Sequence, residues 1–137
     1  MKKVEINLSR EIEEAHSYFS EQSQFYKHKE ILNLDFKDFG VVYALYLKAG
    51  ESIELKYIGK SKGYLFKRRI INHFIKKHEK TGSKLNLILN EFNQGNKVLI
   101  KLIKTVPESY RNTIEEELIN KNRPDWNIQK GRNKEHF

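Results

Sequence analysis

The chain has 137 residues, a length that suits a single domain with one hydrophobic core. Its 38% hydrophobic and 12% aromatic residues favour a folded protein, and the absence of cysteine excludes a disulfide scaffold, a thiolate metal site and a cysteine nucleophile. No apolar run approaches the roughly 18–20 residues that a membrane span needs, and the first residues lack an apolar signal core. We therefore expect a soluble, cytoplasmic protein with no membrane contact.

The net charge of +8 is concentrated in one stretch of the chain. Residues 1–39 carry six Lys or Arg and eight Asp or Glu, whereas residues 56–84 carry ten Lys or Arg and a single Glu. Localised positive charge favours contact with phosphates through counterion release. A solvated helix face would have a similar composition, so charge alone does not separate nucleic-acid binding from an ordinary basic surface.

Hydrophobic periodicity divides the chain into helices and short strands. In chain order we expect one or two amphipathic helices over 9–29, a connector over 32–39, strands over 41–47 and 53–58, helices over 66–80 and 85–92, a strand over 97–103 and a helix over 108–120. Gly50 is expected to join the first two strands into a hairpin, Gly59 to end the second strand, and Ser83 to cap a helix. The order predicts an α+β fold with a small central three-stranded antiparallel sheet flanked by helices and preceded by an N-terminal helical extension.

Two tyrosines lie on the strands of the predicted hairpin. Tyr43 and Tyr57 occupy adjacent strands, and Gly59 and Lys60 follow Tyr57 closely. A phenol can donate or accept a hydrogen bond, and it can transfer a proton when nearby cations lower its pKa. The commoner role of a single strand tyrosine is that of an ordinary sheet aromatic, so each alone is a weak signal.

A second candidate pair lies on the helix predicted over 66–80. Arg69 and His73 are four residues apart, so both side chains emerge on one helix face. A guanidinium can hold a phosphate oxygen with a permanently charged fork while an imidazole offers a titratable group beside it. Lys60 could add a third positive contact. A solvent-facing Arg and His in a basic helix is the alternative.

The third candidate is a run of glutamates, Glu115 to Glu117, in the last predicted helix. One carboxylate, together with waters and substrate oxygens, is enough to bind Mg²⁺. Three successive helix residues point in three directions, so only one can face a given site, and favourable pairing with the helix dipole explains the other two. After this helix, Trp126 is expected to pack on the core and Asn127 to lie near the sheet, unless the segment is a clasp without chemistry.

Taken in order, these residues resemble the signatures of the GIY-YIG nuclease family. The matching segments are Val41-Val42-Tyr43, Tyr57-Ile58-Gly59, Arg69 with His73, Glu115-Glu116-Glu117-Leu118-Ile119 and Pro124-Asp125-Trp126-Asn127. The stretch from Tyr57 to Arg69 is also similar to the nuclease domain of the excision-repair incision subunit. In two places the chain departs from the family: Val41 stands where a glycine is expected, and the loop between Tyr57 and Arg69 is longer than the commonest form.

The resemblance implies a metal-dependent endonuclease that hydrolyses DNA phosphodiester bonds. It implies a nuclease domain over 39–130, the extension over 1–38 and a polar tail over 131–137. The implied catalytic residues are Tyr43, Tyr57, Arg69, His73, Glu115 and Asn127. Family register selects Glu115 to hold a single Mg²⁺ or Mn²⁺ ion. Arg69 would bind a phosphate oxygen and Asn127 would orient the site. Tyr43, with His73 or Tyr57 close by, would position and deprotonate the attacking water.

The basic stretch would then follow the DNA backbone. The implied substrate-binding residues are Lys60, Lys62, Lys67, Arg68, Lys76 and Lys77. The extension over 1–38 could cover the sheet, form a homodimer contact or help to select a site. One rival interpretation is a non-catalytic basic nucleic-acid-binding module of the same fold. Another is a protein-interaction domain whose acidic N-terminal helix is the working surface.

Overall fold

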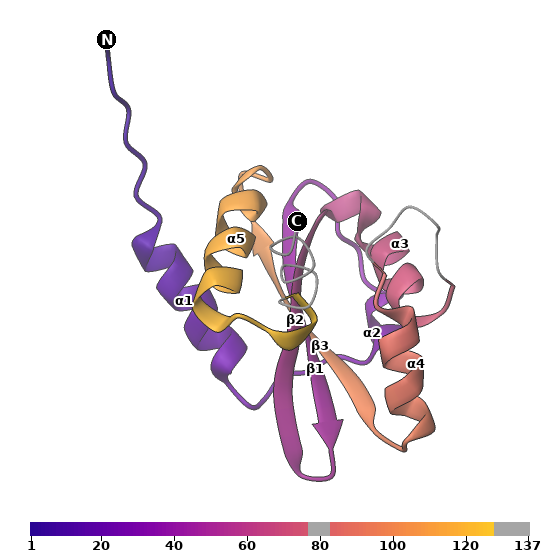
Figure 1. The fold of residues 1–137 in the computed structure, drawn as a ribbon. Coiled ribbons are helices and arrows are strands. Elements are labelled where there is room, and N and C mark those ends of the chain that lie inside the picture. Colours follow the sequence, from indigo (N-terminus) through magenta and orange to yellow (C-terminus); the bar gives the residue numbers. More distant parts are fainter. Residues whose placement is uncertain (77–82, 128–137) are drawn as a thin grey trace, which may run out of the picture.

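The fold is that of a computed structural model, which describes residues 1–76 and 83–127 (Figure 1). In chain order the elements are α1 (Ser9–Ser20), α2 (His28–Ile31), β1 (Gly40–Ala49), β2 (Ser52–Lys62), α3 (Gly63–Phe74), α4 (Leu85–Asn93), β3 (Lys97–Thr105) and α5 (Tyr110–Asn122). The three strands form one antiparallel sheet in the order β2-β1-β3. The predicted α+β fold, with its small central antiparallel sheet, its flanking helices and its N-terminal helix, is confirmed.

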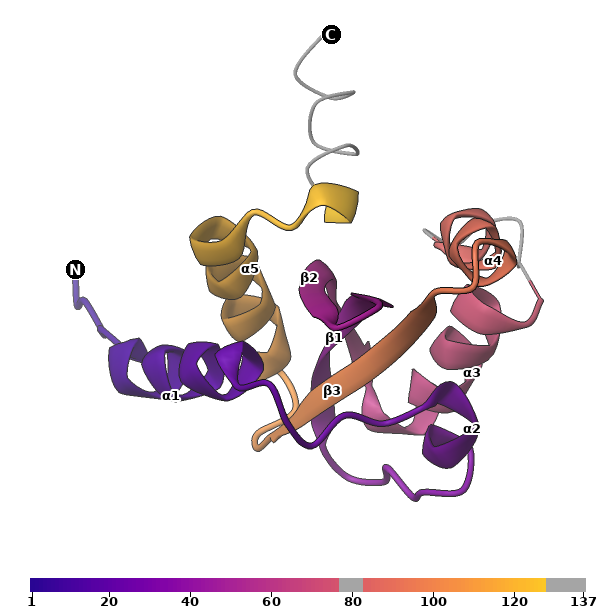
Figure 2. The same ribbon diagram turned by 90° about the horizontal axis from the view of Figure 1, so that it is seen from below.

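The central strand β1 is buried on both faces, which explains its nearly continuous apolar sequence. Successive side chains of a strand point to opposite faces, so β1 contributes to two separate apolar clusters. Val41, Tyr43 and Leu45 lie in the cluster that includes residues of α2, α3 and α4. Val42, Ala44 and Tyr46 lie in the cluster that includes residues of α1 and α5. Figure 2 shows the resulting three layers, with the sheet between the two groups of helices.

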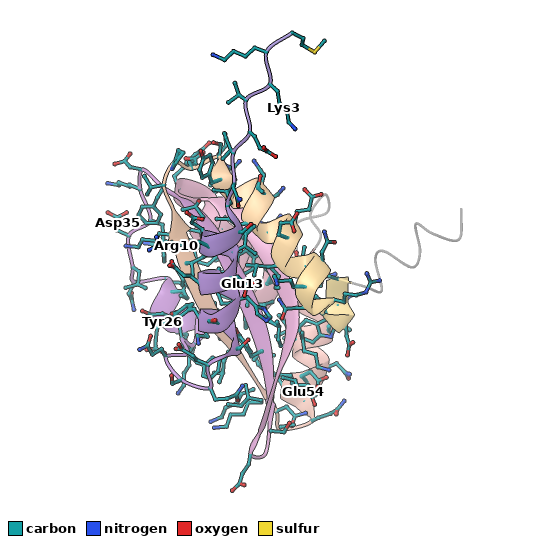
Figure 3. The ribbon with its side chains drawn as sticks, turned by 90° about the vertical axis from the view of Figure 1, so that its left-hand side faces the viewer. Lys3, Arg10, Glu13, Tyr26, Asp35 and Glu54 are labelled. Atoms are coloured by element: carbon teal, nitrogen blue, oxygen red, sulfur yellow. The ribbon has the colours of Figure 1, made fainter. Side chains whose placement is uncertain are left out.

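The N-terminal extension packs against the sheet and pairs with one residue of its edge strand β3. Ala15 and Phe19 of α1 are buried in the cluster with α5. Glu13 of α1, which is labelled in Figure 3, forms a 2.7 Å ion pair with Lys121 of α5. Beyond α1, Tyr26 pairs with Ile100 through two main-chain hydrogen bonds of 2.7 and 2.8 Å on the outer side of β3. These bonds satisfy main-chain groups that an open edge would leave unpaired.

The predicted boundaries at the end of β2 and at both ends of α3 are wrong. Gly59 does not end β2, because the strand continues to Lys62 and Gly59 pairs with Tyr43 of β1. The helix predicted over 66–80 is α3, which begins directly after β2 at Gly63 and ends at Phe74. The early start depends on the absence of a side chain at Gly63, whose amide lies 2.8 Å from the carbonyl oxygen of Phe39. Residues 77–80 of that prediction lie outside the described residues.

Other boundaries are close to those expected. The helix α4 begins at Leu85, and the hydroxyl oxygen of Ser83 accepts a 3.1 Å hydrogen bond from the Leu85 amide. Of the one or two helices expected over 9–29, α1 is present, but residues 21–27 are not helical, because Tyr26 pairs with β3, and the short α2 begins only at His28. Within residues 1–76 and 83–127, no helix combines the length and the apolar character needed to cross a membrane.

Candidate active site

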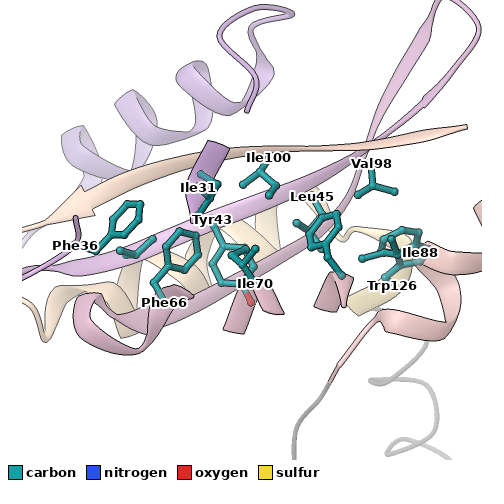
Figure 4. Close-up of a cluster of buried hydrophobic side chains, with 12 residues drawn as sticks. Ile31, Phe36, Tyr43, Leu45, Phe66, Ile70, Ile88, Val98, Ile100 and Trp126 are labelled. Carbon is teal, nitrogen blue, oxygen red and sulfur yellow. The ribbon is translucent and has the colours of Figure 1, made fainter. Parts of the chain in front are cut away.

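Tyr43, at the centre of the sheet, hydrogen-bonds to a histidine on the helix that covers it. Its side chain is fully buried among the apolar residues beneath α3 (Figure 4), and its Oη lies 2.8 Å from Nε2 of His73. The ring fits against β2 because its cross-strand partner is Gly59. A Cβ at Gly59 would stand 2.5 Å from Cζ and 2.6 Å from Oη of Tyr43, so a side chain there would displace the phenol.

A main-chain hydrogen bond fixes the tautomer of His73. The amide of Lys84 donates to Nδ1 of His73 at 3.0 Å, so Nδ1 is an acceptor and the ring proton lies on Nε2. Nε2–H therefore donates to Tyr43 Oη. Burial, together with the charges of Arg69 and Lys84, lowers the pKa of His73 to about 3. The imidazole is thus neutral at physiological pH, with both of its nitrogens engaged.

Tyr57 and Arg69 complete the group around Tyr43. The ring centroid of Tyr57 lies 6.1 Å from that of Tyr43 and 5.5 Å from that of His73. Burial raises the pKa of Tyr57 and the charge of Glu115 raises it further, while Arg69 lowers it. Burial also raises the pKa of Tyr43, which Arg69 likewise lowers. The guanidinium is therefore close enough to stabilise negative charge on either phenol.

Glu115 lies beside the edge strand β2, on the face of the sheet that α5 covers. On α5, Ile114 and Leu118 are buried against the sheet, and this orientation places Glu115 beside β2, with its carboxylate 3.9 Å from Nζ of Lys60. Its side chain is 17% exposed, whereas Glu116 and Glu117 are open to solvent. Burial lowers the pKa of Arg69, but Tyr43, Tyr57 and Glu115 together raise it above its ordinary value. The structure thus brings together carboxylate, guanidinium and two phenols from four elements.

Asn127 is bound to the backbone of β2 next to Tyr57. Its Oδ1 accepts a 2.8 Å hydrogen bond from the Ile58 amide, and its Nδ2 donates a 2.9 Å bond to the Ile58 carbonyl oxygen. Trp126 beside it is buried in the cluster beneath α3. The amide of Asn127 is therefore engaged by main-chain groups, which suits a residue that holds the C-terminal segment against β2 rather than one that reacts.

The remaining basic residues lie outside this cluster. Lys62, Arg68 and Lys76 are exposed and Lys67 is half-buried. Arg68 precedes Arg69 on α3, so its side chain is turned by about 100° around the helix axis. Lys77 lies outside the described residues. The structure thus brings Lys60 to Glu115, while the other described cations lie on the surface outside the cluster.

The donor set around Glu115 fits a hard divalent cation that keeps most of its waters. Among residues 1–76 and 83–127, no three His, Cys, Asp or Glu side chains form a metal-binding group. Mg²⁺ commonly takes one or two carboxylates and completes its shell with water and phosphate oxygens, so Glu115 alone is a sufficient protein ligand. Nε of Arg69 is buried and has no hydrogen-bond partner in the described part of the chain, and a bound oxyanion would satisfy it.

Sequence reasoning missed one residue of this neighbourhood. Lys84 counts among the cations of the basic stretch, but nothing in the pattern singles it out. In the structure its Nζ lies 5.3 Å from the ring centroid of Tyr57, in addition to the amide bond to His73. The only local signal is its position before the first residue of α4. The contact depends on how α3, α4 and β2 pack together.

Comparisons with known proteins add no relative. No protein-family model, curated protein or solved structure matches the chain. The function is therefore argued from the residues and the geometry of the site.

Proposed function

We propose that this protein is a divalent-metal-dependent endonuclease that hydrolyses DNA phosphodiester bonds by a mechanism of the GIY-YIG type. The observation that carries the proposal is the position of Glu115. Its carboxylate belongs to α5, yet it lies next to Lys60 of β2 and shifts the pKa values of Tyr57 and Arg69. A glutamate that served only to pack α5 would not need to lie near a guanidinium, the buried phenol of Tyr43 and the half-buried phenol of Tyr57.

A directed series of hydrogen bonds supports Tyr57 as the general base. The Lys84 amide donates to His73, and His73 donates through Nε2 to Tyr43 Oη. The Tyr43 proton is then available for Tyr57, and hydrogen bonding between the two phenols lowers the pKa of Tyr57. Each donor points toward Tyr57, so these bonds stabilise a phenolate there and offset part of the rise in its pKa that burial causes. His73 cannot take the proton, because its Nδ1 is already occupied and its pKa is about 3.

The other groups divide the electrostatic work of phosphate hydrolysis. Tyr57 in its phenolate form accepts the proton of the attacking water, and Arg69 binds a non-bridging oxygen on which charge grows in the transition state. A Mg²⁺ or Mn²⁺ ion at Glu115 would supply positive charge to the phosphate and to the departing 3′ oxygen. Asn127 maintains the geometry of β2 beside Tyr57.

The basic surface supports DNA as the substrate. Three exposed cations are close in sequence to Tyr57 and Arg69: Lys62, Arg68 and Lys76. A fourth cation, Lys60, lies beside Glu115. Contacts of such cations with phosphates supply affinity without sequence information. The same surface would serve a non-catalytic binding module, but such a module needs no carboxylate beside its phosphate-binding cations. The position of Glu115 therefore favours hydrolysis.

A plasmid-nicking assay tests the proposal. Supercoiled DNA is incubated with the protein in Mg²⁺, in Mn²⁺ and in EDTA, and the open-circular product is measured. We expect nicked circles to accumulate first with either ion, because one site cuts one strand in each event, and no product to form in EDTA. Binding without any nicking in either metal would contradict the proposal and favour the non-catalytic module.

A further inference from the structure

Lys84 lies at the candidate active site. It immediately precedes α4, whereas Lys60 belongs to β2. Its Nζ stands over the Tyr57 ring, 5.3 Å from the centroid, and its side chain is half-buried. At this range the interaction with the ring is favourable and holds the ammonium near the phenol. The positive charge is also felt by His73, since it contributes to the lowered pKa of that imidazole.

The main chain at Lys84 is hydrogen-bonded to the site, so the Lys84 side chain extends from a fixed position. The Lys84 amide donates to Nδ1 of His73 at 3.0 Å. The neighbouring Ser83 hydroxyl donates to the carbonyl oxygen of Asn72 and accepts a hydrogen bond from the Leu85 amide at 3.1 Å. These bonds join the start of α4 to the last turn of α3. The ammonium is therefore presented from a fixed base.

Lys84 and Lys60 consequently lie on different sides of Tyr57. Lys60 is three residues after Tyr57 on β2, so it projects from the opposite face of the strand, toward Glu115 of α5. Lys84 comes from the start of α4 and stands over the ring of Tyr57. Phosphates recur along a nucleic-acid strand, so a substrate whose reacting phosphate lies at Arg69 and Tyr57 presents a second phosphate nearby.

We propose that Lys84 is a further substrate-binding residue, which contacts the backbone phosphate next to the one that is hydrolysed. The identification of the ligand as DNA rests on the proposed function. Lys84 and Lys60 bind two different phosphates of one strand on either side of Tyr57 and thereby align the reacting phosphate with the site.

Lys104 provides a matched control. Its Nζ also lies over an aromatic ring, 4.7 Å from the centroid of Phe39, but it belongs to β3, on the far side of β1 from the edge strand that carries Tyr57. If Lys84 only packs on an aromatic ring, the variants Lys84→Gln and Lys104→Gln will behave alike. If Lys84 binds phosphate, only Lys84→Gln will change DNA binding. Glutamine keeps the main-chain amide, so the bond to His73 remains.

The experiment measures binding of the full chain to a short labelled DNA duplex in EDTA, so that binding is separated from cleavage, over a range of about 50 to 200 mM salt. We expect Lys84→Gln to weaken binding about fivefold and to reduce the slope of log affinity against log salt by about one. Lys104→Gln should leave both quantities unchanged, and Lys84→Arg should restore them. Equal behaviour of the two glutamine variants, or failure of arginine to restore binding, would overturn the proposal.

A parallel nicking assay separates this proposal from the proposed function. If the wild-type chain does not cut DNA in Mg²⁺ or Mn²⁺ but Lys84→Gln still lowers affinity and salt slope, the nuclease function fails and the phosphate contact stands. If the wild type cuts and Lys84→Gln binds and cuts as it does, the nuclease function stands and the contact at Lys84 is refuted.

Discussion

Two tyrosines three residues apart on β1 are buried to the same extent but have different surroundings. Tyr43 is 0% exposed and Tyr46 is 1% exposed, and each hydroxyl makes a hydrogen bond. They point to opposite faces of the sheet. Tyr43 bonds to the side chain of His73, whereas Tyr46 donates to the main-chain carbonyl oxygen of Phe19 at the end of α1.

The difference shows what distinguishes a candidate reactive phenol from a structural one. Burial raises the pKa of both tyrosines, so neither burial nor a raised pKa separates them. The charged side chains around the two tyrosines do separate them, because Arg69 lies close enough to Tyr43 to lower its pKa. The face of Tyr46 also carries a buried charged side chain, that of Lys101. Its Nζ donates to the main-chain carbonyl oxygens of residues 18 and 21. There the polar atoms fix α1 to the sheet.

The largest effect is expected from Glu115, whose carboxylate lies beside Lys60 and influences the pKa values of Tyr57 and Arg69. Glu115→Gln should lower the rate of plasmid nicking by about a thousandfold, because a neutral amide neither binds the metal ion nor balances the nearby cations. Affinity for DNA in EDTA should be retained, since the phosphate-binding cations remain. Glu116→Gln is the matched control, because Glu116 is the next residue on α5 and is exposed. Equal rates for the two variants would refute the role of Glu115.

A smaller but still large effect is expected at Tyr43. Tyr43→Phe keeps the ring beneath α3 but removes the hydroxyl that relays the hydrogen bond of His73 toward Tyr57. We expect the nicking rate to fall about a hundredfold at constant pH, in the range typical of lost acid–base assistance. Circular dichroism and thermal unfolding should show that the variant is folded. A folded Tyr43→Phe variant with the wild-type rate would remove Tyr43 from the mechanism.

Much of the fold follows from local sequence patterns. Each strand is apolar or alternating and each helix has helical spacing, so the element order and the antiparallel sheet are predictable. The wrong end of β2 has a physical cause: Gly59 indicates a break by its sequence, yet it occupies a strand position because only a residue without a side chain leaves room for Tyr43. From the sequence alone, a glycine that packing requires within a strand cannot be distinguished from a glycine that ends a strand.

The candidate site is only partly predictable for a similar reason. Ile114 and Leu118 are four residues apart and apolar, so they define the buried face of α5, and Glu115 lies next to that face. Sequence spacing therefore excludes Glu116, which lies on the opposite side of the helix, but leaves Glu115 and Glu117 on either side of the buried face. The family resemblance is what selects Glu115 of these two. No spacing places Lys84 over Tyr57, because that contact joins the start of α4 to β2. Contacts between elements that are distant in sequence depend on the tertiary packing.

The Tyr43 face should also respond to acid, because its hydrogen-bond partner is titratable. The pKa of His73 is about 3 in the folded protein, against an ordinary 6.5. Between about pH 3 and 6.5 the unfolded chain binds a proton at His73 that the folded protein does not bind. The contribution of neutral His73 to the free energy of unfolding is therefore fully present above about pH 6.5 and is lost as the pH decreases toward 3. The free energy of unfolding should lose up to about 1.4 kcal/mol per pH unit in this window.

His73→Gln tests this dependence, since a glutamine can still accept from the Lys84 amide but does not titrate. Denaturant unfolding at a series of pH values should give a flatter curve for His73→Gln than for the wild type. His28→Gln is the comparison variant, because burial also lowers the pKa of the half-buried His28, but less than that of His73, so its curve should flatten less. A wild-type slope in His73→Gln would mean that other groups control the acid response.

The smallest effect is expected at Tyr46. Tyr46→Phe removes the donor to the Phe19 carbonyl oxygen, a 2.6 Å hydrogen bond in the buried cluster between the sheet and α1. The free energy of unfolding should decrease by about 1 kcal/mol, as expected for one buried hydrogen bond. The nicking rate should stay at the wild-type value, because no charged group of the candidate site contacts this hydroxyl among the described residues. A rate loss like that of Tyr43→Phe would show that the sheet transmits disturbances from either face, and the comparison of the two tyrosines would then not identify the reactive one.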